Sequence, residues 1–307
     1  MIVTELYNGQ GLGNQLWCYV VTRIIAQNNK YEFGIKSIEK FKGHEFLDLD
    51  WGMEVNGGDG PEGGPPSSLP KNINNYYKEK LVRHPINFLD ISKRDDLLLN
   101  IPDNTKIDGN MQSYDYISNH KEKIKNNKNI IKYSNDNICI IHIRGGDFLG
   151  SSAFLPSEYY QNAINYFRKK NTEMIFYIVT DDVDYASDIC PNIPIIGGSI
   201  LEKQDSKKAD HHIGGPIWMD WTIIYNAKNL IISASSFSWW PAWLGGCSSV
   251  IAPMYWGDYK NSDGYWQCGD SLIPEWNFLN RHAEIKCYNE CLNEKLKYEQ
   301  ENKHYWL

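Results

Sequence analysis

The segment after one apolar run has residue types that suit a phosphate site. His142 and Arg144 stand two apart at the end of the run 137–144, so their side chains point the same way if the run is a buried strand. Arginine offers a planar fork of donors, and the two glycines after Arg144 let a ligand approach the backbone. We expect Arg144 to bind phosphate; the alternative is an ion pair between Arg144 and Asp147 at a turn.

Two further polar segments begin where apolar runs end. Asp181 and Asp182 follow the run 174–180, where their carboxylates could accept hydrogen bonds from ribose hydroxyls or a guanine edge. Capping of the next helix is the alternative. Ser235 and Ser236 stand at the expected start of another helix, where hydroxyls and free backbone N–H groups attract an anion. Simple N-capping by serine is compatible with that function.

A glycine-rich turn near the start of the chain, residues 9–13, precedes Asn14. It lacks the G-x-G-x-x-G spacing of dinucleotide-binding turns, so alone it is a weak signal. Asn14 could donate to a phosphate or a sugar across an interdomain cleft, or it could cap the helix that follows.

Strands and helices alternate along the second half of the chain, which predicts a parallel sheet with helices on both faces. Ligands of such sheets bind at the carboxyl ends of the strands, where the polar segments lie. The first half opens with a strand at 2–7, the glycine-rich turn and an amphipathic helix. The other expected strands are 137–144, 174–180, 193–196, 229–234 and 249–253, and the expected helices are 157–170, 216–228 and 235–244.

The chain has 307 residues, enough for two domains, and we place their boundary near residue 135. The prediction is an N-terminal α/β domain, 1–135, and a C-terminal α/β domain, 136–307, with a helical tail after residue 281. A polar helix at 117–132 precedes the boundary.

Composition excludes several classes of protein. The formal net charge is −7 without a basic stripe, so we expect no nucleic-acid partner, and the lysines of 121–132 are expected on a solvated helix or linker. The seven cysteines lack zinc-site spacing, which favours free thiols in a reducing compartment. Cys287 and Cys291, four apart, are expected on one helix face.

We expect neither a signal peptide nor a membrane span in this chain. Residues 230–256 carry no charge, but six Ser, two Pro and two Gly interrupt them, so they are expected to form a buried core element. We expect a soluble, cytoplasmic protein without a transmembrane segment.

Four stretches resemble the family 11 glycosyltransferases, the α-1,2-fucosyltransferases. They are GLGNQLW at 11–17, IIHIRGGD at 140–147, FYIVTDD at 176–182 and SSFSWWPAWL at 235–244. Weaker matches carry the resemblance, in order, over residues 9–256. The SSFSWW stretch together with the H-x-R element is quite specific.

The resemblance implies a GT-B fold, in which two Rossmann-like domains face each other across a cleft, the first on the acceptor side and the second holding GDP-L-fucose. It implies an inverting transfer of L-fucose, without a metal or cofactor, to a galactoside hydroxyl in an α-1,2 linkage. By analogy the acceptor is an oligosaccharide, a surface polysaccharide or a lipid-linked glycan, and a lipid-linked one would be met by peripheral contact at the inner face of the cytoplasmic membrane.

The resemblance also assigns site residues. Arg144 falls on the family's essential phosphate-binding arginine, and Asn14 would reach the diphosphate from the first domain. The remaining donor-binding positions are His142, Asp181, Ser235, Ser236 and Phe237.

Gly145 departs from the family's usual H-x-R-R-G-D pattern, because it replaces the second arginine. One positive charge near the leaving group is missing, which bears on the donor sugar and the linkage more than on the nucleotide site. Two alternatives follow: a transferase that uses another GDP-deoxyhexose, and a non-catalytic module that binds nucleotide or glycan.

Other acids and histidines are candidates for a metal site. The Asp-x-Asp spacing occurs at 48–50 and 182–184, as in metal-dependent sugar transferases, but so short a pattern is often a chance match. His211 and His212 follow Asp210 in what is expected to be a solvated loop. We expect no metal.

The general base that the acceptor hydroxyl needs stays open among His44, Asp48, Asp50 and Asp108. Loop 57–70, rich in Gly and Pro, either covers an acceptor site or is a tolerated insertion.

Overall fold

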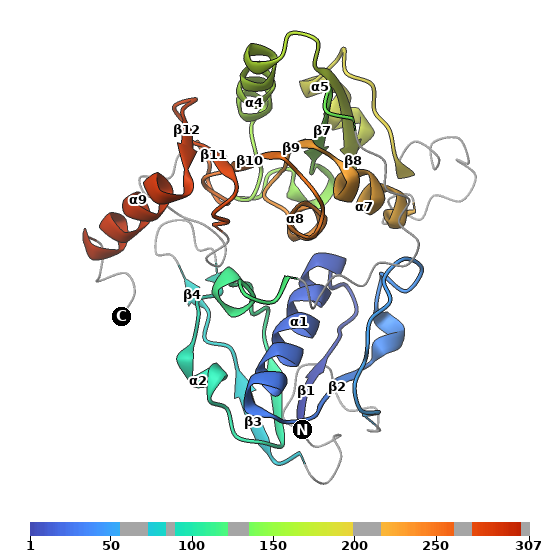
Figure 1. Ribbon diagram of the computed structural model, residues 1–307, viewed down its shortest axis with the longest axis vertical. Helices are drawn as coiled ribbons and strands as arrows, with labels where there is room; N and C mark the ends of the chain where they lie inside the picture. The colour runs from blue at the N-terminus through green and yellow to red at the C-terminus, as the bar shows by residue number, and fades with distance from the viewer. Residues whose placement is uncertain (56–72, 84–89, 122–134, 199–215, 261–271, 302–307) are drawn as a thin grey trace. The chain divides into compact units, whose positions relative to one another are not determined.

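The computed structural model describes two compact α/β units of this chain (Figure 1). The N-terminal unit comprises the described residues 1–55, 73–83 and 90–121, and the C-terminal unit comprises 135–198, 216–260 and 272–301. The predicted boundary near residue 135 stays a prediction. Loop 57–70, most of the polar helix expected at 117–132, and His211 and His212 lie outside the described residues.

The N-terminal unit is built on a four-stranded sheet in the order β2-β1-β6-β3, with every pair parallel. Helix α1 follows the glycine-rich turn and packs against β1 and β2, because its apolar side chains form a broad buried stripe. The elements are β1 Ile2–Glu5, α1 Leu12–Asn29, β2 Phe33–Lys36, β3 Asn75–Lys78, β4 Val82–Arg83, β5 Asp90–Ile91, α2 Asp96–Leu99 and β6 Thr105–Asp108, with 3-10 turns at Ile38–Lys40 and Tyr114–Tyr116.

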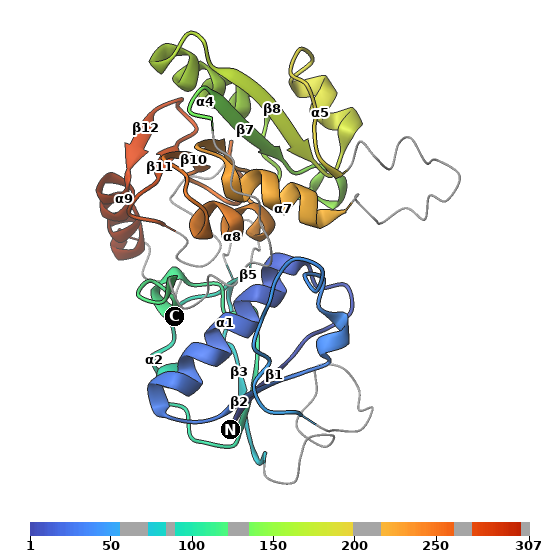
Figure 2. The ribbon, with the colours of Figure 1, turned by 45° about the vertical axis from the view of Figure 1, so that its right-hand side comes forward.

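The C-terminal unit contains a six-stranded sheet in the order β12-β11-β10-β9-β7-β8, parallel except for β12. Figure 2 shows α4 and α5 on one side of this sheet and α7 and α8 on the other. The elements are β7 Ile138–Ile143, a 3-10 turn Gly146–Phe148, α4 Ser157–Lys170, β8 Ile175–Thr180, α5 Val183–Ile189, α7 Ile217–Asn226, β9 Asn229–Ile231, α8 Ser236–Leu244, β10 Ser249–Pro253, β11 Asn277–Leu279, β12 Ile285–Cys287 and α9 Tyr288–Glu301.

Together the two units confirm the predicted α/β fold class. Each is a mainly parallel sheet with connecting helices, as two Rossmann-like domains require.

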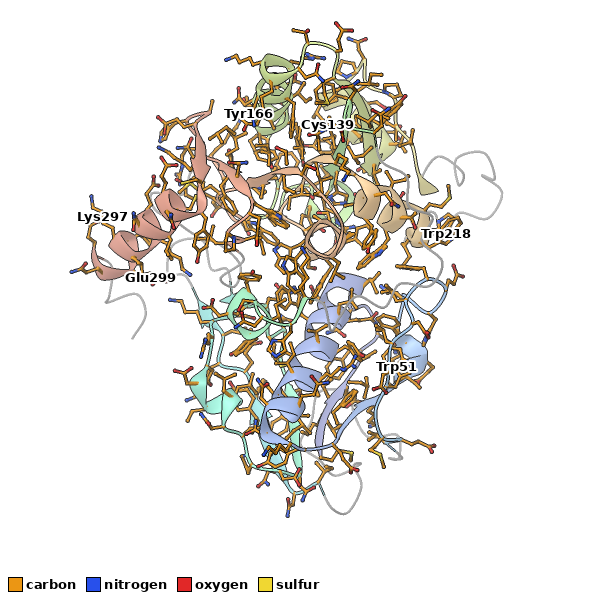
Figure 3. The ribbon with its side chains drawn as sticks, in the orientation of Figure 1. Trp51, Cys139, Tyr166, Trp218, Lys297 and Glu299 are labelled. Atoms are coloured by element: carbon orange, nitrogen blue, oxygen red, sulfur yellow. The ribbon has the colours of Figure 1, made fainter. Side chains whose placement is uncertain are left out.

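Aromatic side chains fill much of the core of the C-terminal unit. Trp239, Trp240 and Trp243 are at most 2 % exposed, and the rings of Trp239 and Trp240 meet edge to face at 5.2 Å. Trp218, at the start of α7, is instead 41 % exposed (Figure 3). The uncharged stretch 230–256 forms β9, α8 and β10, as expected of a core element. Among the described helices, none combines the length and apolar character needed to cross a membrane.

Two local predictions were wrong. Residues 193–196 make only one bridge, Ile195 to Ile178, because Pro194 has no N–H to continue a ladder. Cys287 and Cys291 do not share a helix face, since Cys287 ends β12 and its backbone N–H donates to the Glu290 carboxylate as α9 begins. Of the helix expected at 117–132, residues 117–119 are turns and Lys121 is helical, and the remainder from 122 on lies outside the described residues, so this helix stays a prediction.

Candidate functional site

Three neighbouring strands bring the predicted polar segments of the C-terminal unit to one edge. The order β9-β7-β8 is parallel throughout, so the carboxyl ends of these strands lie side by side. Arg144 follows β7, Asp181 follows β8, and Ser235 follows β9. The structure therefore brings together the residues that the sequence placed at separate strand ends.

Arg144 is held by two carboxylates. Its Nη1 lies 2.8 Å from Oδ2 of Asp181, and its Nη2 lies 2.6 Å from Oδ1 of Asp147. Its Cζ is 5.0 Å from the centroid of the Phe148 ring. The Arg144–Asp147 ion pair considered as an alternative is thus present, but 29 % of the Arg144 side chain is exposed, which leaves its charge accessible at the edge.

The Nε of Arg144 is buried and has no hydrogen-bond partner within the described parts of the chain. Buried donors usually have a partner, and an unpaired donor costs free energy. An anion bound beside this guanidinium could accept a hydrogen bond from the Nε–H group of Arg144.

Asp181 and Asp182 bind the turn that follows Arg144. Oδ1 of Asp181 accepts from the Gly145 N–H at 2.9 Å, and Oδ2 of Asp182 accepts from the Gly146 N–H at 3.1 Å. Asp182 also caps α5 through the Tyr185 N–H at 3.0 Å, so the capping alternative is confirmed for this acid. Burial raises the pKa of Asp181, and the Arg144 charge opposes that rise.

Gly145 has no room for a side chain. A Cβ built on it would lie 2.5 Å from Cβ of Asp182, and Gly146 next to it has φ +47°, which favours glycine. Glycine at position 145, where the family's pattern has a second arginine, therefore allows the turn after β7 to lie close to the end of β8.

His142 lies within β7, one residue before the carboxyl end of that strand, and is only 3 % exposed. Its Nδ1 is 2.7 Å from Oγ of Ser233, and its ring lies 5.9 Å from that of Phe237. Burial, with the nearby Arg144 charge, lowers the pKa of His142 to about 3, so its imidazole is uncharged at neutral pH. Among these residues Ser233 was missed, although it stands at the end of the same apolar run, two residues before Ser235.

Helix α8 begins at the same edge. The Ser235 hydroxyl accepts a hydrogen bond from the Phe237 N–H at 3.3 Å, which confirms the N-capping alternative. Ser235 itself is buried. Ser236 and Phe237, in the first turn, are half-buried. The amino end of a helix carries partial positive charge, so the start of α8 can attract an anion while capped by serine.

In the N-terminal unit, Asn14 is oriented by a neighbouring loop. Nε2 of Gln112 donates to Oδ1 of Asn14 at 2.7 Å. The capping alternative for Asn14 is wrong, because α1 begins at Leu12 with Gly11 at the cap position. The contact with Gln112 fixes the orientation of the Asn14 side chain within the N-terminal unit.

The four candidate bases occupy different surroundings. Asp108 ends β6 at the carboxyl edge of the sheet, is 7 % exposed, and accepts from the hydroxyls of Tyr7 and of Tyr76, the latter at 2.8 Å. Burial and the Asp108 charge raise the pKa of Tyr76 to about 12, so this phenol stays protonated.

The other three candidates lie on the surface after β2. Asp48, Asp50 and His44 are exposed, and Oδ1 of Asp50 accepts from the Gly52 N–H. The His44 ring packs on the ring of Trp51, with the ring centroids 5.6 Å apart. Of the four, Asp108 alone stands where ligands of an open α/β sheet bind.

No group of three His, Cys, Asp or Glu side chains able to hold a metal occurs among the described residues. Asp48 and Asp50 of the first Asp-x-Asp pair are exposed, and Asp182 of the second serves as a helix cap. The acids and histidine that the sequence offered are thus dispersed or already engaged in the described parts of the chain.

Comparison with known proteins gives one family. Residues 104–280, more than half of the chain, match the model of "Glycosyl transferase family 11". Similar proteins include an α-1,2-colitosyltransferase of Escherichia coli, 26 % identical over 54 % of this chain and 60 % of that protein. The O-antigen biosynthesis glycosyltransferase WbnK of Escherichia coli is 30 % identical over 40 % of each chain.

A more distant relative is the galactoside α-(1,2)-fucosyltransferase 1 of Leontocebus fuscicollis, 22 % identical over 46 % of this chain and 38 % of that protein. The matched stretches therefore span 60 % or less of these relatives. Among solved structures, the fucosyltransferase NodZ from Bradyrhizobium aligns with a TM-score of 0.44 and 13 % identity, over 81 % of this chain and 94 % of that one.

Proposed function

Because the chain belongs to glycosyltransferase family 11, we propose that it transfers L-fucose from GDP-L-fucose to a galactoside hydroxyl in an α-1,2 linkage, as a galactoside α-1,2-fucosyltransferase. The acceptor is an oligosaccharide or a surface polysaccharide. The names of two relatives, an α-1,2-colitosyltransferase and a galactoside α-(1,2)-fucosyltransferase, support the linkage.

One observation carries the proposal: a guanidinium and a serine-capped helix start stand at the ends of adjacent parallel strands. Neighbouring strands are about 4.8 Å apart, a separation that a diphosphate can bridge. Arg144 follows β7 and Ser235 caps α8 after β9. We assign the GDP-sugar to the C-terminal domain, 136–307, with His142, Phe237, Ser236 and Asp181 as further donor-site residues.

Transfer builds positive charge on the sugar and negative charge on the departing GDP. Fixed donors that already point at the diphosphate stabilise that charge without a metal ion or cofactor. Arg144 and the start of α8 supply such donors, and we assign Asn14 of the N-terminal, acceptor-side domain (1–135) to the same diphosphate. The reaction inverts the anomeric carbon.

We propose Asp108 as the general base that takes the proton of the acceptor hydroxyl. Its carboxylate is held by two phenols that remain protonated donors, and it stands at the carboxyl edge of its sheet. A lipid-linked acceptor would be met in the cytoplasm, through peripheral contact with the inner face of the membrane.

A second candidate is transfer of another deoxyhexose from its GDP derivative. The relative named an α-1,2-colitosyltransferase favours it, as does Gly145 in place of the family's second arginine. Assays with GDP-fucose and GDP-colitose side by side separate the two donors. Tight binding of nucleotide or glycan without turnover of either donor would indicate the non-catalytic module.

Replacement of Arg144 by alanine tests the donor site. A charge-assisted hydrogen bond contributes about 1.5–3 kcal/mol, so Arg144→Ala should lower the transfer rate at least about 10-fold to 100-fold. The matched control is Arg168→Ala, which removes an exposed arginine of α4 that packs on Phe176. Transfer at the wild-type rate by Arg144→Ala would refute the assignment.

A further inference from the structure

Both oxygens of Asp181 are engaged by one short segment of chain. Oδ2 lies 2.8 Å from Nη1 of Arg144, and Oδ1 accepts from the N–H of Gly145, the next residue, at 2.9 Å. One carboxylate therefore links the guanidinium to the backbone immediately after it. This double contact sets the direction in which the Arg144 side chain leaves β7.

Asp147 pairs with the same guanidinium, but from the solvent side. Its side chain is 71 % exposed, against 24 % for Asp181. Exposed ion pairs add little to the order of a side chain, because water and salt screen them. The two carboxylates therefore differ in function. The buried Asp181 can hold the Arg144 guanidinium in place, and the exposed Asp147 can be displaced from it.

The turn that Asp181 holds is also tightly confined. Gly146 donates to Asp182, and a Cβ at Gly145 would meet Cβ of Asp182 at 2.5 Å. Asp182 in turn caps α5, so it is attached to a regular element. Arg144 is therefore anchored at its backbone by the end of β8 and at its guanidinium by Asp181.

We propose that Asp181 is a positioning residue that acts through Arg144: it holds the guanidinium toward the donor diphosphate and does not itself contact the nucleotide. This inference rests on the proposed function, since it takes a GDP-sugar as the ligand. Asp181 thus stays part of the proposed donor site, but the direct nucleotide contact that the family resemblance implies for it is replaced by a contact to Arg144.

A double-mutant cycle on GDP affinity, measured by titration calorimetry, tests the proposal. The variants are Asp181→Asn, Arg144→Met and the two combined. Asp181→Asn should weaken GDP binding about 10-fold in the presence of Arg144. In the Arg144→Met background there is no guanidinium to hold, so the same change should alter the affinity less than about 2-fold.

Asp188→Asn is the control variant, because it removes an exposed carboxylate from α5, beyond the segment that contacts Arg144. Thermal unfolding followed by circular dichroism checks that each variant folds. If Asp181→Asn does not fold, Asp181→Ser, which removes the charge and leaves room for water, takes its place in the cycle.

Equal losses of affinity in both backgrounds would mean that Asp181 contacts the nucleotide directly, and would overturn the proposal. An unchanged affinity of Asp181→Asn in the presence of Arg144 would overturn it as well. Wild-type protein that binds no GDP would instead refute the proposed function, and the inference with it, before any variant is compared.

Discussion

At the scale of single residues, the charge of Arg144 is shared between two acids of unequal burial. Asp181 is mostly buried and also accepts from backbone, whereas the Asp147 carboxylate is largely in solvent. A diphosphate that approaches Arg144 from solvent would take the place of Asp147. The exposed acid is thus expected to compete with the donor.

Asp147→Asn should therefore strengthen GDP binding. An exposed ion pair contributes up to about 1 kcal/mol, which corresponds to an affinity gain of up to about 5-fold. Titration calorimetry at low and high ionic strength measures it, and the gain should shrink with salt as the competing charge is screened. Weaker binding by Asp147→Asn would show that this carboxylate supports the donor site.

The residue types at strand ends could be predicted from the sequence, but their partners could not. The pattern identified Arg144, Asp181 and Ser235 because each follows an apolar run, which is a local property. Tyr7 and Tyr76 were missed as partners of Asp108, since Tyr7 follows β1, Tyr76 lies in β3, and no spacing in the sequence relates them.

At the scale of elements, a buried ion network joins three strands of the N-terminal unit. Glu5 of β1 lies 3.2 Å from Nζ of Lys36 on β2 and 2.9 Å from Nζ of Lys106 on β6. All three side chains are at most 10 % exposed. Burial raises the pKa of Glu5, but the hydrogen bonds and charges of Lys106 and Lys36 outweigh it and lower the pKa below the usual 4.5.

Glu5→Gln should destabilise the N-terminal unit by about 3–5 kcal/mol, because it removes a buried carboxylate charge that two buried ammonium groups contact. Urea unfolding at pH 7 measures the change, and Glu39→Gln, at an exposed acid, is the control. A loss no larger than that of the control would contradict the stabilising function of this network.

The same network predicts a pH dependence. A carboxylate whose pKa is lower in the folded than in the unfolded state stabilises the fold above the unfolded pKa. For Glu5 this contribution should be present above about pH 4.5 and be lost as the pH falls further, and Glu5→Gln should lack that part of the acid sensitivity.

Long elements were easier to predict than short ones. Helix α4 has the predicted bounds, 157–170, because its apolar side chains repeat at helical spacing over 14 residues. Strands β3 and β6 were missed, since they have four residues each and include polar side chains such as Lys106 that only their neighbours bury. Short strands depend on the rest of their sheet.

At the scale of the whole molecule, two α/β units each have a mainly parallel sheet with polar residues at its carboxyl edge. In the C-terminal unit that edge holds Arg144, Asp181 and Ser235, and in the N-terminal unit it holds Asp108. The family match at 104–280 includes all three of these residues of the C-terminal unit and the whole of β6 with Asp108.

Metal independence is a prediction at this scale, since the proposed catalysis depends on charges fixed in the chain. Transfer activity measured after treatment with EDTA should equal that of untreated protein, because arginine and helix N–H groups supply the positive charge. Loss of activity in EDTA with recovery in manganese would favour the Asp-x-Asp pairs as ligands.

The sequence by itself determined the α/β class, the apolar runs and the polar residues that end them, because these depend on side chains close together in the chain. Only the tertiary structure decided that Asp181 faces Arg144 and that Asp182 fills the space beside Gly145. The hydrogen bonds that accompany these contacts, Gly145 to Asp181 and Gly146 to Asp182, join residues 36 apart in the chain and exist because β8 lies next to β7. Strand order depends on how whole elements pack, and no short stretch of sequence specifies it.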